Sequence, residues 1–386
     1  MQKVKDVALA GHVTDAEQSW WRVLLPVSTR LGREISGLDV SGRTASCFQH
    51  VTMTNAWTLL PLVEAGARLR IAAVNPDSTD DTAAAFLAEH GAEVWAWTRM
   101  GDGAMLEGLE WLLSEPSDAV SDMGGELIAG CVQRGIAPAG ALEATTSGLH
   151  RLAGLEIPFP VFDWNSIPLK DRLHNRHHVG LTAWPAFSAI TGLALHGRSV
   201  LVIGFGPVGR GVALHGRALG AVVSVAEIDP VRALEAQHHG CREVSLDEGL
   251  ATSSVVVTAT GIEGVLGPEQ LRRLRPDAIV VNVGHSNREI DVAWLEQQPH
   301  EPVRQSIDRY TIDGRDVFLL NRGSLVNLAP GSGAGVDEYF DPFAAIILQG
   351  LAWVLTGGAE GAKPGLQAYP PHLEQAIADL ARRART

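Results

Sequence analysis

The residues best suited to chemistry begin with three glycines, Gly204, Gly206 and Gly209, in the spacing G-x-G-x-x-G. An apolar segment with the pattern of a strand precedes them, and a helical pattern, a second strand and Glu227 follow. These parts, in this order and with the acid roughly 20 residues beyond the glycines, are typical of a dinucleotide-binding βαβ unit. We therefore predict that the chain binds a dinucleotide.

Each residue of this fingerprint has a physical role. Gly204 permits the tight turn off the strand, Gly206 lets the backbone approach a pyrophosphate, and Gly209 lets the helix pack closely on the sheet. The helix that starts at Pro207 and Val208 would direct its N-terminal amides at the phosphates.

The acid decides between the two nicotinamide dinucleotides. Glu227 would bind the adenosine ribose hydroxyls and repel a 2′-phosphate, which favours NAD over NADP. Arg232, five residues later, leaves NADP open as the alternative.

Composition limits the class of protein. The chain has 386 residues, 46% of them hydrophobic and 19% charged, and a net charge of −13 without a basic block. This length exceeds what one core usually holds, so two domains are expected. The acidic balance argues against nucleic acid or a membrane surface as the partner, and favours a small molecule.

The sequence shows no pattern typical of a signal peptide, a membrane span or a redox-active cysteine pair. The N-terminal apolar stretch is too short for a signal peptide, and the longest apolar run, 343–357, is interrupted by Gln349, so we expect a cytoplasmic protein without a membrane span. The cysteines are odd in number and lack metal or redox spacing, so we expect them to be buried apolar residues: Cys47, Cys131 and Cys241.

The elements that must position the fingerprint form an α/β pattern. The sequence predicts two domains, an NAD-binding Rossmann domain with a doubly wound parallel sheet and a second α/β substrate domain. Predicted strands fall at 68–74, 93–97, 121 with 126–128, 253–258, 277–283 and 316–320, and predicted helices at 56–65, 80–89 and 372–383. The predicted parts are 1–178 for substrate and catalysis, 179–336 for NAD, and 337–386 for a C-terminal helical return and tail.

Further segments resemble the S-adenosylhomocysteine hydrolase family over residues 1 to about 330. They read CFQHVT at 47–52, STDDTAA at 78–84, EATTSG at 143–148, EIDP at 227–230, NVGH at 282–285, DRYT at 308–311 and LVNL at 325–328. The family's enzymes oxidise the ribose 3′-hydroxyl with NAD, remove the 4′-hydrogen, expel the 5′ substituent, add water and return the hydride. The resemblance implies a cofactor that is recycled within each turnover.

The resemblance also implies cofactor contacts outside the fingerprint. Thr145, Thr146 and Ser147 match a threonine run that meets NAD. Asn327 matches an asparagine near the nicotinamide amide, and Thr258 with Gly261 would line the adenosine side.

The implied catalytic residues lie mostly in the first half of the chain. Lys170 and Asn175 match the pair beside the 3′-hydroxyl, where a lysine can take a proton if burial lowers its pKa. His50 and His285 match histidines near the 5′ position, and the predicted set is completed by Asp122 and His174. The alternatives are a surface role for Lys170, and capping or core roles for the histidines.

The sequence departs from the family around the substrate. At six positions this chain differs from the family. Met123 and His174 stand where the family has aspartates, and Ala144 and Thr54 stand where it has glutamates. Ser332 stands in place of a methionine and Val179 in place of a cysteine. We expect the substrate-binding residues to be Thr52, Thr54, Met123, Ala144 and Ser332, with Thr52 alternatively capping a helix.

These departures indicate a changed substrate or a shortened reaction. An enzyme that stops at elimination would be a nucleoside 5′-dehydratase that leaves an exocyclic alkene, as found in angustmycin-type nucleoside antibiotics. The alternatives are a true S-adenosylhomocysteine hydrolase with a drifted pocket and a catalytically silent NAD-binding regulator.

Two further features bear on partners. The histidines His174, His177 and His178 have spacing that could suit a metal, but no acid or cysteine completes a site, so we expect substrate contacts and no metal. The C-terminus, ALARRART, lacks the family's lysine and tyrosine motif that reaches a neighbouring subunit, so we expect a homo-oligomer that is either a dimer or a tetramer.

Overall fold

The computed structural model describes residues 3–284, 287–329, 332 and 336–384. The chain divides into two compact units, unit 1 with Met1–Lys170 and Asp337–Thr386, and unit 2 with Asp171–Val336. We predicted divisions at 178/179 and at 336/337, the second followed by a C-terminal helical return and tail. The structure has the second division at the same place and the first one earlier, at 170/171. The C-terminal segment belongs to unit 1, because it supplies a strand and two helices there.

Unit 1 contains a parallel sheet. Among its described residues the strand order is β1-β4-β3-β2-β5-β6-β7-β16. The strands are β1 (Lys3–Val4), β2 (Thr44–Gln49), β3 (Arg68–Ala73), β4 (Glu93–Ala96), β5 (Ala119–Asp122), β6 (Gly140–Glu143), β7 (Pro160–Asp163) and β16 (Gly365–Ala368). The inner strands are buried on both faces, as expected of parallel strands covered by helices.

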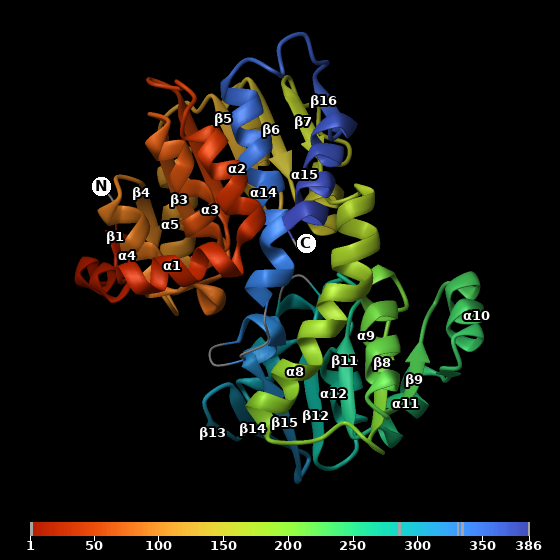
Figure 1. The fold of residues 1–386 in the computed structure, drawn as a ribbon. Coiled ribbons are helices and arrows are strands. Elements are labelled where there is room, and N and C mark those ends of the chain that lie inside the picture. Colours follow the sequence, from red (N-terminus) through yellow and green to blue (C-terminus); the bar gives the residue numbers. More distant parts are fainter. Residues whose placement is uncertain (1–2, 285–286, 330–331, 333–335, 385–386) are drawn as a thin grey trace. The chain divides into compact units, whose positions relative to one another are not determined.

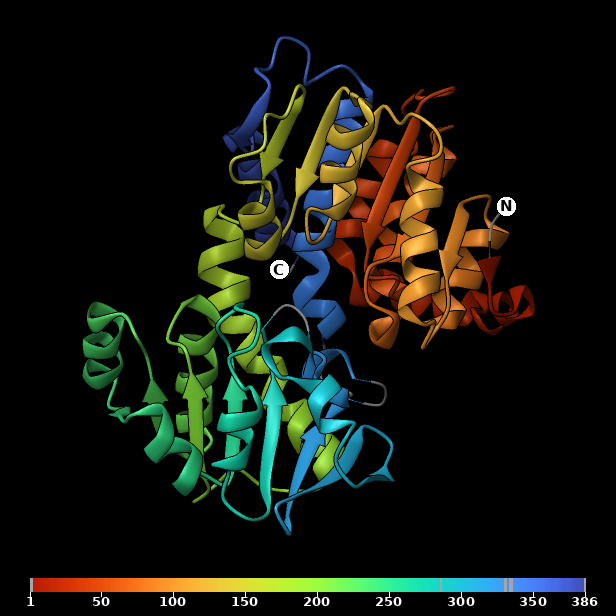
Figure 2. The same cartoon turned by 180° about the vertical axis from the view of Figure 1, so that it is seen from behind.

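Helices cover both faces of this sheet (Figure 1 and, from behind, Figure 2). They are η1 (Val7–His12), α1 (Asp15–Leu24), α2 (Pro26–Ile35), α3 (Met53–Glu64), η2 (Pro76–Ser78), α4 (Asp81–Glu89), α5 (Asp102–Leu112), α6 (Glu126–Arg134), α7 (Thr146–Leu152), α14 (Val336–Leu355) and α15 (Pro371–Ala384). Helix α6 corrects one prediction: 126–128 is not a strand, because the strand ends at Asp122 and the apolar residues after it belong to a helix.

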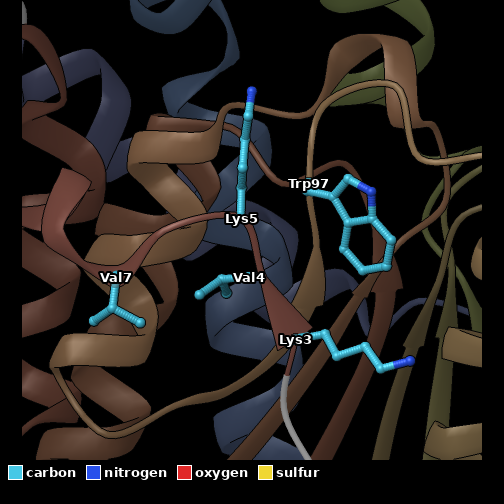
Figure 3. A pocket seen from close by; sticks show the side chains of 5 residues that line it. All are labelled: Lys3, Val4, Lys5, Val7 and Trp97. Atoms are coloured by element: carbon cyan, nitrogen blue, oxygen red, sulfur yellow. The ribbon is translucent and has the colours of Figure 1, made fainter.

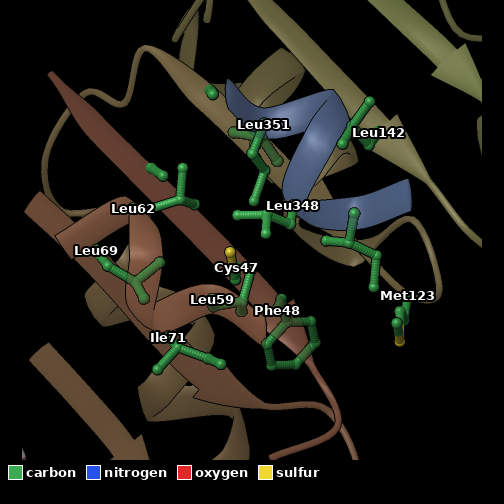
Figure 4. Close-up of a cluster of buried hydrophobic side chains, with 14 of the residues drawn as sticks. Cys47, Phe48, Leu59, Leu62, Leu69, Ile71, Met123, Leu142, Leu348 and Leu351 are labelled. Carbon is green, nitrogen blue, oxygen red and sulfur yellow. The ribbon is translucent and has the colours of Figure 1, made fainter. Parts of the chain in front are cut away.

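Helix α14 is the central helix of the unit 1 core, which explains the long apolar run near the C-terminus. In Figure 4, Leu348 and Leu351 of α14 lie with Cys47 of β2 and Leu59 of α3 in one apolar cluster. Asp341 at the polar end of α14 accepts hydrogen bonds from the amides of Val27 (2.7 Å) and Ser28 (2.8 Å), so it caps α2. Across the described residues, no helix is long and apolar enough to cross a membrane.

Unit 2 has the strand order of a dinucleotide-binding fold, β10-β9-β8-β11-β12-β15-β14-β13 within its described residues. The strands are β8 (Ser199–Ile203), β9 (Val222–Ala226), β10 (Arg242–Glu243), β11 (Val255–Thr258), β12 (Ala278–Asn282), β13 (His300–Arg304), β14 (Ile307–Ile312) and β15 (Arg315–Leu320). Six neighbouring strands, β10, β9, β8, β11, β12 and β15, pair in parallel. Strands β14 and β13 add an antiparallel edge that the sequence did not predict. The predicted α/β class with two parallel-sheet domains is confirmed.

The helical elements of unit 2 follow its strands. They are α8 (Val179–Thr191), α9 (Pro207–Ala218), α10 (Pro230–His238), α11 (Leu246–Thr252), α12 (Pro268–Arg272), η4 (Asn287–Glu289), α13 (Val292–Leu295), η5 (Asn321–Gly323) and η6 (Val326–Leu328). A π-helix, η3 (Leu169–His178), carries the chain from unit 1 into unit 2 and contains Lys170. Such π-helical turns are rare in proteins, and those that occur are often found at functional sites.

Candidate functional site

The carboxyl edge of the unit 2 sheet holds the glycine fingerprint. Strand order reverses between β8 and β11, and ligands of open α/β sheets bind at such a switch point. The turn of Gly204 to Gly206 follows β8, Glu227 follows β9, and Thr258 ends β11.

The fingerprint geometry fits a dinucleotide. Gly204 has φ +91°, and a Cβ on Gly209 would lie 2.0 Å from the Gly204 carbonyl oxygen, so both positions require glycine. A Cβ on Gly206 would meet no described atom closer than Arg232 Nη1 at 3.6 Å, which leaves room for a ligand. Helix α9 starts at Pro207 without a side-chain cap, so its first amides, from Val208 on, are available to a phosphate.

Glu227 has a structural role that the sequence did not reveal. Its Oε2 accepts a hydrogen bond from the Phe205 amide at 2.5 Å, and its Oε1 accepts from the amides of Ile228 (2.8 Å) and Asp229 (2.9 Å). The carboxylate therefore fixes the turn after β8 against the end of β9. A contact with the ribose stays a prediction, as does a role for Arg232, whose Nε lies 3.8 Å from Asp229 Oδ2.

Asn327 and Thr258 occupy different environments. Asn327 Nδ2 donates to Thr182 Oγ1 at 3.2 Å, while its buried Oδ1 has no hydrogen-bond partner among the described residues, which fits an amide donor such as that of a nicotinamide. Thr258 has no exposed surface, and its hydroxyl donates to Asn282 Oδ1 at 3.1 Å. Thr258 thus supports the edge from inside, whereas Gly261, with φ +69°, lies on the loop beyond β11.

Unit 1 has its own switch point, between β2 and β5. Predicted catalytic and substrate-binding residues follow neighbouring strands there: His50 follows β2, Met123 follows β5 and Ala144 follows β6. The fold of unit 1 therefore brings residues that are far apart in the sequence to one carboxyl edge.

The β2 end of this edge carries His50 and two threonines. His50 Nδ1 lies 2.6 Å from Ser78 Oγ, a contact between the ends of β2 and β3. Thr52 caps α3, since its hydroxyl accepts from the Asn55 amide at 3.4 Å. Thr54 is buried, and its hydroxyl donates to Asp337 Oδ1.

Lys170 lies where β7 ends. Its Nζ is 5.8 Å from the centroid of the Trp164 ring, and Trp164 directly follows β7. Burial lowers the pKa of Lys170 to about 7, the value that a base for a hydroxyl proton needs at neutral pH. Asn175 lies on the same π-helix five residues later, and its predicted contact with the sugar stays a prediction.

The histidines after Lys170 make contacts with one another. His174 Nδ1 lies 3.2 Å from Asn175 Oδ1, and the ring centroids of His174 and His178 are 6.3 Å apart. The ring of His177 lies 6.1 Å from that of His215 on α9. In the described parts of the chain, no group of three or more His, Cys, Asp or Glu side chains is arranged to hold a metal ion.

The ends of β5 and β6 carry buried side chains of two kinds, apolar and acidic. Met123 and Ala144 are each 4% exposed and pack in the core. The preceding residues, Asp122 and Glu143, have buried carboxyl groups, and burial raises the pKa of both. A catalytic role for Asp122 stays a prediction, because this carboxyl has no exposed surface and accepts a hydrogen bond from the Ile128 amide at 2.8 Å.

Glu143 organises the threonine run, a role that was not predicted from the sequence. Its Oε1 accepts from the amide and the hydroxyl of Thr145, both at 2.7 Å. Thr145 in turn caps α7 by accepting from the Gly148 amide at 2.9 Å. This leaves Thr146 exposed and Ser147 half-buried, available to the predicted cofactor contacts.

The remaining predicted site residues are Ser332 and His285. Ser332 Oγ donates to the Asn327 carbonyl oxygen at 3.2 Å, so it supports a predicted cofactor residue. His285 lies outside the described residues. A surface pocket lined by Lys3, Val4, Lys5, Val7 and Trp97 (Figure 3) lies by the edge strand β1 and contains none of the predicted site residues.

Comparisons with known proteins agree with this geometry. Residues 33–137 match the family described as S-adenosyl-L-homocysteine hydrolase, and residues 186–333 match the NAD binding domain of S-adenosyl-L-homocysteine hydrolase. The second match covers the fingerprint, so the predicted NAD cofactor is confirmed.

Curated relatives match along most of the chain. S-inosyl-L-homocysteine hydrolase of Methanopyrus kandleri is 31% identical, over 98% of this chain and 91% of that protein. Adenosylhomocysteinase of Aeropyrum pernix is 37% identical, over 86% of this chain and 82% of that protein. Adenosylhomocysteinase of Thermotoga maritima is 32% identical, over 94% of this chain and 92% of that protein.

Proposed function

Since the chain belongs to the S-adenosylhomocysteine hydrolase family, we propose that it is an NAD-dependent enzyme that eliminates the 5′ substituent, water, from a modified nucleoside. The single observation that carries the proposal is the contrast at the unit 1 edge. Lys170 is present with a pKa of about 7, while the positions after β5 and β6 hold the buried, uncharged side chains of Met123 and Ala144 where the family has carboxylates.

The proposed reaction removes one water molecule from the nucleoside overall. Bound NAD supplies the reversible oxidation of the 3′-hydroxyl to a ketone, and it ends the cycle in the state in which it began. Next to a ketone, the 4′ C–H bond is acidic enough to lose its proton. The electron pair then forms the 4′,5′ double bond as the 5′ C–O bond breaks. The released 4′ proton would be taken up by neutral His50 and passed to the leaving oxygen, which becomes water.

The residues of this chain would handle the protons. Lys170 in its neutral form accepts the 3′-hydroxyl proton, and in its charged form it stabilises the enolate oxygen. His50 would donate the proton to the leaving oxygen, and its contact with Ser78 would hold its ring in place. Asn175 would orient the 3′-hydroxyl.

Loss of carboxylates supports elimination without hydration. Hydrolysis requires a group that guides water to the alkene and a site that binds the amino acid of a homocysteine. Met123 and Ala144 offer neither a charge nor a hydrogen-bonding side chain. An enzyme with this edge would release the alkene instead of adding water to it.

A hydrolase is the second candidate, and the relatives named S-inosyl-L-homocysteine hydrolase and adenosylhomocysteinase favour it. The two candidates differ in their products. The protein would be incubated with S-adenosylhomocysteine, with S-inosylhomocysteine and with unmodified nucleosides, and free thiol and nucleoside products would be quantified. Dehydrated nucleoside without thiol release supports the dehydratase, whereas rapid thiol release from either thioether contradicts it.

A further inference from the structure

Glu289, at the end of η4, is a buried acid that neither the fingerprint nor the proposed reaction uses. Its side chain is 2% exposed. Its Oε2 accepts hydrogen bonds from the amide (3.0 Å) and the hydroxyl (2.8 Å) of Thr260, and its Oε1 accepts from the Gly261 amide at 2.8 Å. All these donors belong to the loop after β11.

The backbone around Glu289 holds the same loop at its far end. The Leu266 amide donates to the Glu289 carbonyl oxygen at 2.9 Å, and the Gly264 amide donates to that of Arg288 at 2.8 Å. The Asp291 amide donates to the Leu266 carbonyl oxygen at 3.0 Å. The loop from Thr260 to Leu266 is thus tied at both ends to one short segment.

The loop transmits this restraint to the glycine fingerprint. Thr260 Cγ2 lies 3.1 Å from the position that a Cβ on Gly204 would take, and Ala259 Cβ lies 3.4 Å from the corresponding position on Gly209. The bond from the Thr260 hydroxyl to Glu289 selects the rotamer in which the methyl group faces Gly204. The carboxylate therefore sets the wall against which the turn after β8 packs.

The chain after β12 is fitted to the same carboxylate. A Cβ on Gly284 would lie 1.6 Å from Glu289 Oε1, so a larger residue there would displace the carboxylate. Glu289 consequently sits between the loops that leave β11 and β12, beside the switch point where a dinucleotide binds.

We infer that Glu289 is a positioning residue for NAD: it holds the Thr260–Gly261 loop against the Gly204 turn, and retention of NAD depends on this contact. Burial raises the pKa of Glu289, and the hydrogen bonds from Thr260 and Gly261 oppose that rise. The inference rests on NAD binding and is independent of the proposed elimination.

The variants separate this role from general stability. Glu289→Gln keeps the size of the side chain but turns one acceptor oxygen into a donor that faces a backbone N–H. Thr260→Val removes only the hydroxyl, and Thr260→Ser restores it. Glu263→Gln is the matched control, because Glu263 is on the same loop but is exposed and paired with Arg288 at 3.1 Å.

The measurement is the rate at which the holoenzyme exchanges its bound NAD for isotopically labelled NAD, followed by mass spectrometry. Since a lost hydrogen bond to a charged group changes an equilibrium by about 10- to 100-fold, Glu289→Gln and Thr260→Val should release NAD faster by about that factor. Thr260→Ser, which keeps the hydroxyl but lacks the methyl group beside Gly204, should release NAD more slowly than Thr260→Val. Glu263→Gln should match the wild type. Hydrogen exchange at the amides of Thr260 and Gly261 should accelerate in Glu289→Gln before any global unfolding.

Two results would overturn the inference. One is wild-type NAD exchange in folded Glu289→Gln. The other, which remains decisive if Glu289→Gln fails to fold, is an equal exchange rate for Thr260→Val and Thr260→Ser. Because no nucleoside substrate is involved, neither result depends on which reaction the enzyme catalyses.

Discussion

At the scale of single residues, Lys170 is the group whose chemistry depends most on its surroundings. A pKa of about 7 means that the amine is present in both protonation states at neutral pH, so it can take a proton and return it within one cycle. Burial produces that value, because an ammonium ion removed from water loses solvation and its charged form is disfavoured.

Replacing Lys170 with Met should abolish reduction of bound NAD by substrate, a loss of about 10²- to 10⁴-fold in rate. In the wild type the rate should rise with pH through about 7, because the neutral amine is the base. Stopped-flow absorbance of the reduced cofactor measures both effects. Lys363→Met is the control, since Lys363 is exposed, and unchanged reduction by Lys170→Met would refute the role of base.

Lys170→Met, which should abolish the reaction, should at the same time raise the stability of the fold near pH 6. The folded pKa of Lys170 lies below the ordinary lysine value of about 10.4, so the unfolded state binds this proton more tightly. Wild-type stability should therefore fall as pH drops from about 10 to about 7, and Lys170→Met should unfold at a higher temperature than the wild type near pH 6. A lower melting temperature for Lys170→Met at that pH would contradict the assigned burial.

At the scale of elements, the turn from β8 into α9 contains glycines with two different roles, one in packing and one in leaving room for the cofactor. A Cβ on Gly209 would collide with the Gly204 carbonyl oxygen, whereas a Cβ on Gly206 has room in the protein itself. Gly209→Ala should therefore lower both stability and NAD binding. Gly206→Ala should melt like the wild type but lose most of its NAD, as measured by calorimetric titration; full NAD affinity in Gly206→Ala would show that the turn does not face the cofactor.

The ends of β5 and β6 predict an unusual pH dependence of stability. Burial raises the pKa of Asp122 to about 7, and that of Glu143 is raised in the same direction. Between about pH 4 and about pH 7 the folded state binds more protons than the unfolded state. The stability that the protonated carboxyl groups contribute is therefore full below about pH 4 and is lost as the pH rises through about 7. Asp122→Asn should flatten this slope in thermal melts between pH 4 and 8, with exposed Glu107→Gln as the control; an unchanged slope would refute the assignment.

The sequence predicted elements better than it predicted long-range partners. Strands β3, β4, β11, β12 and β15 and the fingerprint follow from local apolar patterns, which is why they were found. Strand β16 is exposed on alternate residues and pairs with distant β7, so its pattern carries little signal. Glu143 and Glu289 were missed because their donors lie in loops that only the folded sheets bring near.

At the scale of the whole molecule, each unit offers the carboxyl edge of its own parallel sheet. The unit 2 edge fits NAD through the glycine turn, the amides of α9 and Asn327 Oδ1. The unit 1 edge gathers His50 and Lys170 with the apolar Met123 and Ala144. The predicted homo-oligomer, dimer or tetramer, stays a prediction that light scattering of the purified protein measures.

The central claim is that NAD is recycled while a nucleoside loses water. The most direct test incubates the NAD-loaded protein with a panel of nucleosides and nucleoside thioethers and analyses the products by mass spectrometry. The account predicts a product lighter than its nucleoside by one water molecule, with the base intact and no net consumption of NAD. Release of homocysteine from a thioether, with no dehydrated product from any nucleoside, would contradict it.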